Sequence, residues 1–326
     1  MIESKKMRAT RKPVSVIVLN YNGASIAVRA VSAQLAEAKS VHPASELVFL
    51  DNASTDGSAD AVEKKFPQVR VLRMQKNSFL HAFNYALKLA KYEAVILINN
   101  DMLPQKGCFL RLVSGLAPDV FAVGPKILVP GMKKINFTFA RPRFRLGFFS
   151  VERIGMDEDD RGQCDFARPI ESLYPPIASA FDKKKLLAIG GFDALYDPAY
   201  WEDVDLGYSA WKRGWRTLYD SKAVTIHDHQ RTIEKGYRKS AVLYWISKNK
   251  HLFIAKNFSD CGMRIQYVLA LPFIVAAGTF RHGFPFLSGF FGALCQMGAA
   301  LCRNREAERH RKLSDREIFG ITGGKL

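Results

Sequence analysis

The 326-residue sequence predicts an α/β protein in which helices cover both faces of a parallel sheet. Two observations in its first hundred residues predict this class. Short runs of Val, Ile and Leu alternate with longer segments in which apolar residues recur at helical spacing. The short runs are apolar throughout, which is typical of strands buried on both faces. A third observation, a hydrophobic content of 48% that includes 23 Phe, excludes a disordered chain.

In the first half of the chain, strands are predicted where β-branched residues form short runs. Helices are predicted where apolar residues recur with a period of about 3.6 residues. Alternation of this kind indicates strand–helix–strand units and therefore a parallel sheet. The predicted order is strand 14–19, helix 26–38, strand 47–50, helix 59–65, strand 69–73, helix 79–91 and strand 95–98.

The middle of the chain breaks this alternation. Residues 126–175 are basic and aromatic and are predicted to form loops and a β-hairpin over the sheet edge. The acidic run 157–160 within them is predicted to be a solvated turn. The alternation then resumes, with a strand at 177–181, helices at 183–189 and 202–213, and strands at 215–219 and 223–226.

The last hundred residues have a different character. A long basic and aromatic helix is predicted over 234–257, followed by two apolar segments at 265–280 and 283–302. Each apolar segment is close to the roughly 20 residues that span a bilayer. They could form a membrane hairpin, helices lying in one leaflet, or a buried helical pair. Basic residues beside them, from Arg264 and Arg303 onward, favour contact with an anionic cytoplasmic leaflet.

The net charge is +17, and it is unevenly distributed. Residues 1–12, 126–153, 231–264 and 303–316 carry +4, +6, +6 and +3, so the rest of the chain nets −2. This pattern favours a diphosphate substrate or an anionic membrane as partner. A basic protein that binds nucleic acid or membrane without enzymatic activity is the alternative, and nucleic-acid binding would depend strongly on salt. The polar N-terminus and only five Cys predict a cytoplasmic protein with reduced thiols.

Polar clusters follow three of the predicted strands, at 20–22, 51–52 and 99–101. The carboxyl ends of parallel strands form the ligand-binding edge of such sheets. Asp101 lies at this edge, where Mg²⁺ or Mn²⁺ could share carboxylate and diphosphate oxygens. His227 follows the last predicted strand and is a second candidate ligand, since imidazole also binds Mn²⁺.

Three carboxylates occur within four residues at the start of the helix predicted from residue 202. They are Glu202, Asp203 and Asp205. A general base that deprotonates a hydroxyl must be a carboxylate or similar group within hydrogen-bond reach of it. The spacing alone leaves open whether Glu202 or Asp203 is that base.

Five motifs occur in a fixed order along the chain: VSVIVLNYNG at 14–23, DNASTDGS at 51–58, NNDM at 99–102, GGFD at 190–193 and WEDVDL at 201–206. Together they resemble family 2 glycosyltransferases with the GT-A fold, especially the bacterial rhamnosyltransferase-like branch. The resemblance implies inverting transfer of a hexose or deoxyhexose from a nucleotide-diphosphate sugar to an acceptor hydroxyl. It also implies a role in cell-surface polysaccharide or glycolipid assembly, with a glycan or lipid-linked acceptor.

The resemblance implies roles for individual residues on the donor side. Asn20, Tyr21 and Asn22 match the loop that embraces the nucleoside, and Asp51 matches the acid that hydrogen-bonds the base. Asn77 would lie near the same end of the site. The bulky run at 79–81 departs from the small residue common in the family, which leaves the donor open.

The resemblance also implies the catalytic groups. Asn99 and Asn100 with Asp101 match the D-x-D motif, in which Asp101 would bind Mg²⁺ or Mn²⁺. Asp203 matches the catalytic base, and Glu202 would orient the acceptor. His227 matches a histidine that binds diphosphate or metal.

On this basis three parts are predicted. They are a basic tail at 1–12, a GT-A catalytic domain at 13–230 and a helical extension at 231–326 that associates with the inner face of the cell membrane. Nucleic acid is not an expected partner. A dinucleotide-binding oxidoreductase is excluded, because the first predicted strand ends in NYNG and lacks the G-x-G-x-x-G loop.

Overall fold

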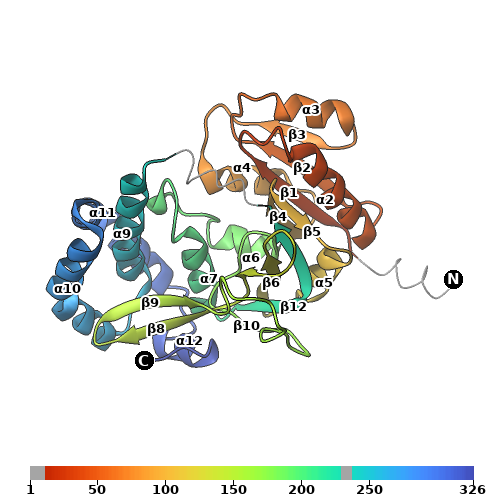
Figure 1. The fold of residues 1–326 in the computed structure, drawn as a ribbon. Coiled ribbons are helices and arrows are strands. Elements are labelled where there is room, and N and C mark those ends of the chain that lie inside the picture. The colour runs from red at the N-terminus through yellow and green to blue at the C-terminus, as the bar shows by residue number, and fades with distance from the viewer. Residues whose placement is uncertain (1–11, 229–236) are drawn as a thin grey trace.

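A computed structural model describes residues 12–228 and 237–326 (Figure 1). Most of the predicted basic tail and the predicted boundary at residues 230 and 231 lie outside these residues. The described chain is a mixed α/β structure with helices at its C-terminal end, as the sequence predicts.

One sheet of ten strands forms the centre of the described residues, in the order β10-β12-β6-β11-β4-β1-β2-β3. Strand β5 is added on β12, and β7 on β6. The strands are β1 (Val14–Asn20), β2 (Glu46–Asp51), β3 (Arg70–Arg73), β4 (Ala94–Asn99), β5 (Met102–Pro104), β6 (Val120–Leu128), β7 (Ile135–Phe137), β10 (Ile170–Glu171), β11 (Ser179–Asp182) and β12 (Arg216–His227).

The sheet is mixed, so the parallel pairing that the sequence predicts holds for only part of it. Strands β1 to β4 pair in parallel, but β11 runs antiparallel between β4 and β6. Ala178, just before β11, donates its backbone N–H to Leu97 near the carboxyl end of β4. The chain therefore enters β11 from the carboxyl edge and must run back along its neighbours.

Successive residues of the central strands point into two separate apolar clusters, as the period of two in a strand requires. Val16 and Val18 of β1 belong to one cluster and Ile17 to the other. Helices α2 (Ala27–Val41), α3 (Ser58–Lys65) and α5 (Cys108–Ser114) pack in the first cluster, and α4 (Ala82–Leu89) and α6 (Lys183–Ala188) in the second. Helices thus cover both faces of the sheet (Figure 1).

Two further strand predictions need correction. Strand β6 is fully buried in the sheet but is not among the predicted strands, because Gly124 and Pro125 interrupt its apolar run. The strands predicted at 215–219 and 223–226 are one strand, β12, whose register shifts between Asp220 and Val224. The sequence pattern is broken at that irregularity, although the chain stays extended.

The predicted hairpin exists as β8 (Ala140–Arg145) and β9 (Phe148–Arg153), which form a sheet of their own. It extends from the central sheet towards the C-terminal helices and does not cover the sheet edge (Figure 1). Other parts of 126–175 are strands of the main sheet, namely β7, β10 and the end of β6.

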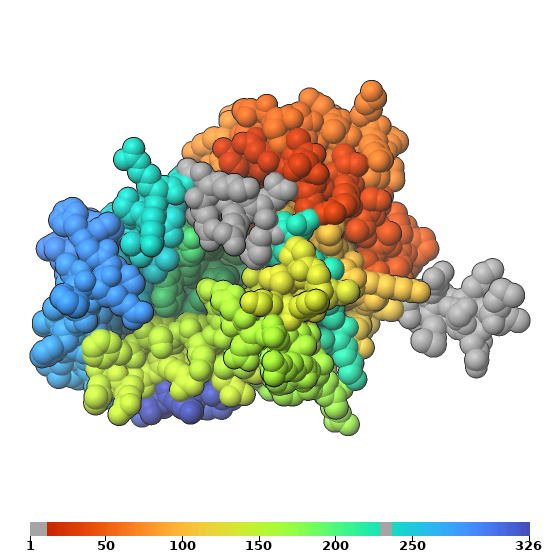
Figure 2. Space-filling model, viewed as in Figure 1, coloured from red at the N-terminus to blue at the C-terminus, as the bar shows by residue number. Residues whose placement is uncertain are grey.

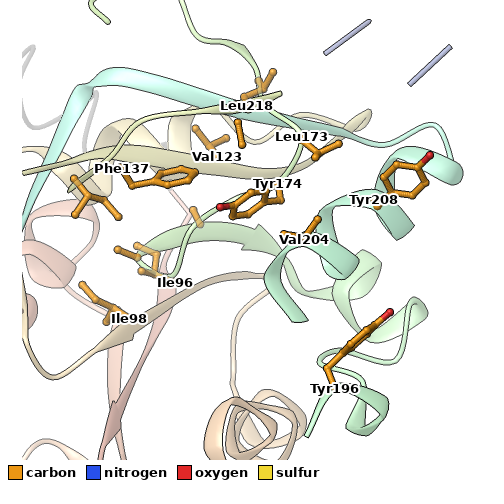
Figure 3. Close-up of a cluster of buried hydrophobic side chains, with 14 of the residues drawn as sticks. Ile96, Ile98, Val123, Phe137, Leu173, Tyr174, Tyr196, Val204, Tyr208 and Leu218 are labelled. Carbon is orange, nitrogen blue, oxygen red and sulfur yellow. The ribbon is translucent and has the colours of Figure 1, made fainter. Parts of the chain in front are cut away.

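The core continues from the sheet to helix α7 (Glu202–Lys212), as Figure 3 shows. Tyr174 lies between strand residues such as Val123 and the helix residue Val204, and all three are buried. This packing fixes the start of α7 relative to the carboxyl edge of the sheet. Gly207 allows the close approach, since a Cβ there would lie 2.5 Å from the Tyr174 backbone.

The C-terminal extension is α9 (Lys239–Asn257), α10 (Cys261–His282), α11 (Phe284–Glu308) and α12 (Asp315–Ile321). Helices α10 and α11 are long and apolar enough to cross a membrane, and 22% and 17% of their most apolar windows are buried. Pro272 lies inside α10, which continues through it. Helix α12 packs back against α7, where Asp315 accepts a hydrogen bond from Tyr208 and pairs with Lys212.

Candidate active site

A cavity of about 430 Å³ opens at the carboxyl edge of the sheet. Residues from both halves of the chain form its walls. Of the predicted site residues, Tyr21, Asn77, Asn99, Asn100, Asp101, Glu202 and Asp203 line it. The sheet register explains this convergence, because Leu19 of β1 pairs with Asn99 of β4, and Asn20 pairs with Asp51 of β2.

Asn20 and Asp51 lie beneath the cavity and connect its loops. The Asn20 side chain is fully buried, and its amide donates to Asp51 Oδ1 (2.9 Å) and to the hydroxyl of Ser58 (2.8 Å). Its Oδ1 accepts from the Asn100 amide. Both predicted donor residues therefore hold the ends of β1, β2 and β4 together. Asn22, with φ of 50°, is exposed and fixes the Thr55 backbone through its Oδ1.

Asn77 lines the cavity together with Asn52. The Asn52 amide donates to Asn77 Oδ1 (2.8 Å), and Asn52 Oδ1 accepts from the Ser78 backbone. Asn52 belongs to the DNASTDGS motif at 51–58, but no role is predicted for it from the sequence. The Phe79 ring and the Tyr237 ring, 6.0 Å apart, provide an apolar wall beside these amides.

Asp101 and His227 are brought together by strand pairing. His227 ends β12 and pairs with Met102 of β5, immediately after Asp101. His227 Nε2 lies 3.2 Å from Asp101 Oδ2, and its Nδ1 lies 3.0 Å from Asn136 Oδ1. Asn136 is a contact that the sequence does not predict, since it lies ninety residues away in β7.

These residues fit a divalent cation that also binds a diphosphate. Asp101 Oδ1 is buried and has no hydrogen-bond partner among the described residues. The described parts of the chain contain no group of three His, Cys, Asp or Glu that could hold an ion alone. Mg²⁺ commonly takes only one or two protein carboxylates and completes its shell with substrate phosphates and water.

Glu202 and Asp203 begin α7 after an unusual turn. Tyr200 and Trp201 have φ of 75° and 78°, in the left-handed region that residues with side chains rarely adopt. This turn carries both carboxylates into the cavity. Burial and the neighbouring Asp203 raise the pKa of Glu202 to about 8. Burial also raises the pKa of Asp203, while Arg153 opposes that rise. Glu202 is therefore the carboxyl of the pair that keeps its proton at neutral pH.

Helix α9 holds the turn before these carboxylates. The Asn249 amide donates to the backbone carbonyls of Tyr196, Ala199 and Tyr200 at 2.6–2.9 Å. Lys248 donates to the carbonyl of Asp197 (2.8 Å). The helical extension is therefore part of the site's support, which the sequence does not reveal because more than forty residues separate these partners.

Asp205, the third carboxylate of the cluster, points away from the cavity into a buried network. Its Oδ2 accepts from Lys256 Nζ (2.6 Å), and its Oδ1 accepts from Tyr196 and Asn257. Lys256 also donates to Asp193 (2.8 Å). Asp205 thus joins α7 to α9 and is structural.

Residues 15–164 match the family model described as glycosyl transferase family 2. The matched segment contains the strands and loops that supply the cavity wall from Leu19 to Asp101. The match and the fold together support a family 2 glycosyltransferase. The comparison with curated proteins finds no match.

Solved glycosyltransferases have a similar fold. GalNAc-T7 with UDP, GalNAc and Mn²⁺ is 15% identical with a TM-score of 0.63, and the match covers 89% of this chain and 58% of that one. This chain thus spans little more than half of GalNAc-T7. S. aureus TarS 1–349 with UDP-GlcNAc is 17% identical (TM-score 0.56, 91% of each chain). The Pyrobaculum calidifontis mannosyltransferase PcManGT with GDP-Man and Mn²⁺ is 18% identical (TM-score 0.54, 97% and 85%).

These similarities confirm the predicted fold class, a GT-A sheet with a C-terminal helical extension that contains two apolar helices. The sequence identities are all below 20%, so they concern the fold alone. The description of the site therefore rests on the contacts between residues of this chain.

Proposed function

We propose that this family 2 glycosyltransferase transfers a hexose or deoxyhexose, with inversion, from a nucleotide-diphosphate sugar to an acceptor hydroxyl. The observation that carries the proposal is the single cavity lined by Asp101 on one side and by Glu202 and Asp203 on another. Such a cavity can hold the leaving diphosphate and a base on the attacking hydroxyl at the same time. The nucleotide sugars bound by the solved relatives support the donor class.

In the proposed reaction, the acceptor oxygen attacks the anomeric carbon as the bond to the diphosphate breaks. Asp203 accepts the proton of the hydroxyl, and protonated Glu202 can hydrogen-bond the acceptor. Tyr21, Asn77 and the Phe79–Tyr237 wall would position the nucleoside. Asp101 and His227 would hold Mg²⁺ or Mn²⁺, whose charge neutralises the departing diphosphate.

Donor binding is tested by thermal unfolding of the full chain with UDP, GDP or dTDP and Mn²⁺. We expect one nucleotide to raise the melting temperature, because a ligand that binds only the folded state stabilises it by about 2.7 kcal/mol at one hundred times its Kd. The Tyr21→Ala variant should lose most of this shift. Failure of all three nucleotides, with and without their sugars, would falsify the proposed donor class.

Metal dependence is tested separately by removing divalent cations. We expect turnover to fall to background in excess chelator and to return with added Mn²⁺ or Mg²⁺. The Asp101→Asn variant should bind Mn²⁺ more weakly in the presence of nucleotide, measured by calorimetry. Full activity in chelator would remove Asp101 and His227 from the proposed metal role.

We also propose a cytoplasmic enzyme that acts at the inner face of the cell membrane in polysaccharide or glycolipid assembly. Support comes from α10 and α11, whose exposed side chains include Val268, Leu269, Phe273 and Phe280. Phe280 is 96% exposed, which is unusual for so large an apolar side chain in water. The basic residues flanking these helices would meet anionic lipid.

A further inference from the structure

A second cavity, of about 850 Å³, lies on the other side of the catalytic carboxylates. Its walls are β9, the turn before α7, and helix α9, and the loop between α10 and α11 closes one end. Figure 2 shows it as a hollow between α9 and the β8–β9 hairpin, with the green segments of the chain at its floor. Glu202 and Asp203 line both this cavity and the donor cavity.

Two cations, Lys250 and Arg153, line this cavity, and Arg153 already interacts electrostatically with Asp203. Among the described residues, none forms a direct ion pair with Lys250 or Arg153. Lys250 projects from α9, and burial lowers the pKa of its ammonium because no acid offsets the cost. Arg153 donates its Nε–H to the hydroxyl of Tyr174 (3.0 Å) and an Nη1–H to Met156 Sδ (4.0 Å), so among the described residues only its Nη2 has no hydrogen-bond partner. An anionic ligand would compensate the charge of Lys250 and accept a hydrogen bond from Arg153.

An apolar groove of about 760 Å³ between α10 and α11 begins next to this cavity. Thr279 lines the groove and His282 lines the cavity, three residues apart on α10. On α11, Phe290 lines the groove and Phe286 lines the cavity, four residues apart. Residues at these spacings share one face of a helix, so the polar cavity and the apolar groove are lined by neighbouring residues of α10 and α11.

We propose that the acceptor is an amphiphile with a phosphate ester, which binds Lys250 and Arg153, and a hydrocarbon chain, which lies in the α10–α11 groove. Its hydroxyl then reaches Asp203 from the side opposite the donor. The idea rests on the proposed transferase function for the identity of the ligand as acceptor.

The test measures binding of three probes to the full-length protein by calorimetry, below micelle-forming concentrations. They are dodecyl phosphate, dodecyl glucoside as an uncharged amphiphile of equal chain length, and inorganic phosphate. We expect dodecyl phosphate to bind at least about tenfold more tightly than either, the scale of one charge-assisted hydrogen bond. Equal binding of the two amphiphiles overturns the anion site, and equal binding of inorganic phosphate overturns the hydrocarbon groove.

Matched variants assign the effect to residues. Lys250→Met should abolish the preference for dodecyl phosphate, Lys250→Arg should retain it, and the exposed Lys239→Met on the same helix should leave it unchanged. Ala276→Trp should fill the groove and weaken both amphiphiles, whereas the neighbouring exposed Ala277→Trp should not. A preference that survives Lys250→Met overturns the proposal.

Nucleotide binding on the same samples separates this proposal from the proposed function. If a nucleotide binds but the amphiphile preference is absent, the acceptor proposal fails and the transferase proposal stands. If the preference is present while no nucleotide binds, the site for the amphiphile stands and the transferase proposal fails.

Discussion

Replacing Asp203 with Asn should lower kcat by at least about 100-fold while nucleotide binding changes little. The substitution keeps the size of the side chain and its place at the start of α7, but removes the carboxylate that we propose accepts the proton of the acceptor hydroxyl. Loss of a general base costs about 100- to 10,000-fold in rate. Steady-state kinetics with the identified donor gives kcat, and calorimetry with the nucleotide gives the donor affinity.

Glu202→Gln is the matched control for this result. Since burial and Asp203 raise the pKa of Glu202 to about 8, Glu202 is protonated at neutral pH, and Gln reproduces its uncharged state. We expect a loss of less than about tenfold at pH 7. Above about pH 8 the wild-type Glu202 ionises while Gln cannot, so the two pH profiles should diverge there. A larger loss from Glu202→Gln than from Asp203→Asn would reverse the two roles.

Replacing Lys256 with Met should destabilise the folded protein by about 3–5 kcal/mol. Lys256 is buried between Asp193 and Asp205, and its removal leaves two carboxylates without their shared cation. Breaking a buried ion pair from one side typically costs this much, because the remaining charge is neither hydrated nor paired. Urea unfolding followed by far-ultraviolet circular dichroism measures the change.

The pH dependence of this loss identifies its cause. Burial acts to raise the pKa of Asp193, but Lys256 and Arg303 hold it below its ordinary value. This stabilisation is present above the ordinary carboxylate pKa and disappears as the pH falls through the folded value. Without Lys256 the Asp193 carboxylate takes up its proton at a higher pH, so the difference between variant and wild type should be smaller at about pH 5 than at about pH 8. Lys239→Met, an exposed change on the same helix, should have little effect at either pH. If the loss of stability did not vary with pH, its cause would be lost packing and not the lost ion pairs.

Much of the site could be predicted from sequence because its parts are local. Each strand of a parallel sheet ends where a loop begins, so a polar cluster after an apolar run marks the ligand edge without knowledge of the fold. Tyr21 and Asp101 were predicted in this way. Asn77 was implied by the family resemblance, and Glu202 and Asp203 by the carboxylate cluster at a helix start. All five line one cavity. The two apolar helices could be predicted from composition, but not the manner in which they meet a membrane.

Other features depend on contacts between distant parts of the chain. Arg153 and Lys250 are unremarkable basic residues in the sequence, and only the packing of β9 against α9 places them beside Asp203. Nothing in the sequence distinguishes Asn249, and only the fold places its amide against the turn before α7. Strand direction is also set by long-range contacts. The sequence therefore predicts the strand at β11 but not that it runs antiparallel to its neighbours.

The sequence by itself determined the α/β class, the order of most strands, and the loops that carry the reacting groups. Hydrophobic period and turn chemistry act over a few residues, so they are visible in the chain alone. The tertiary structure decided that Glu202 and Asp203 line two cavities, how α9 supports the turn before them, and which cations and apolar side chains lie beside the second cavity. Those arrangements come from side chains packed across forty to more than a hundred residues, and no local pattern encodes them.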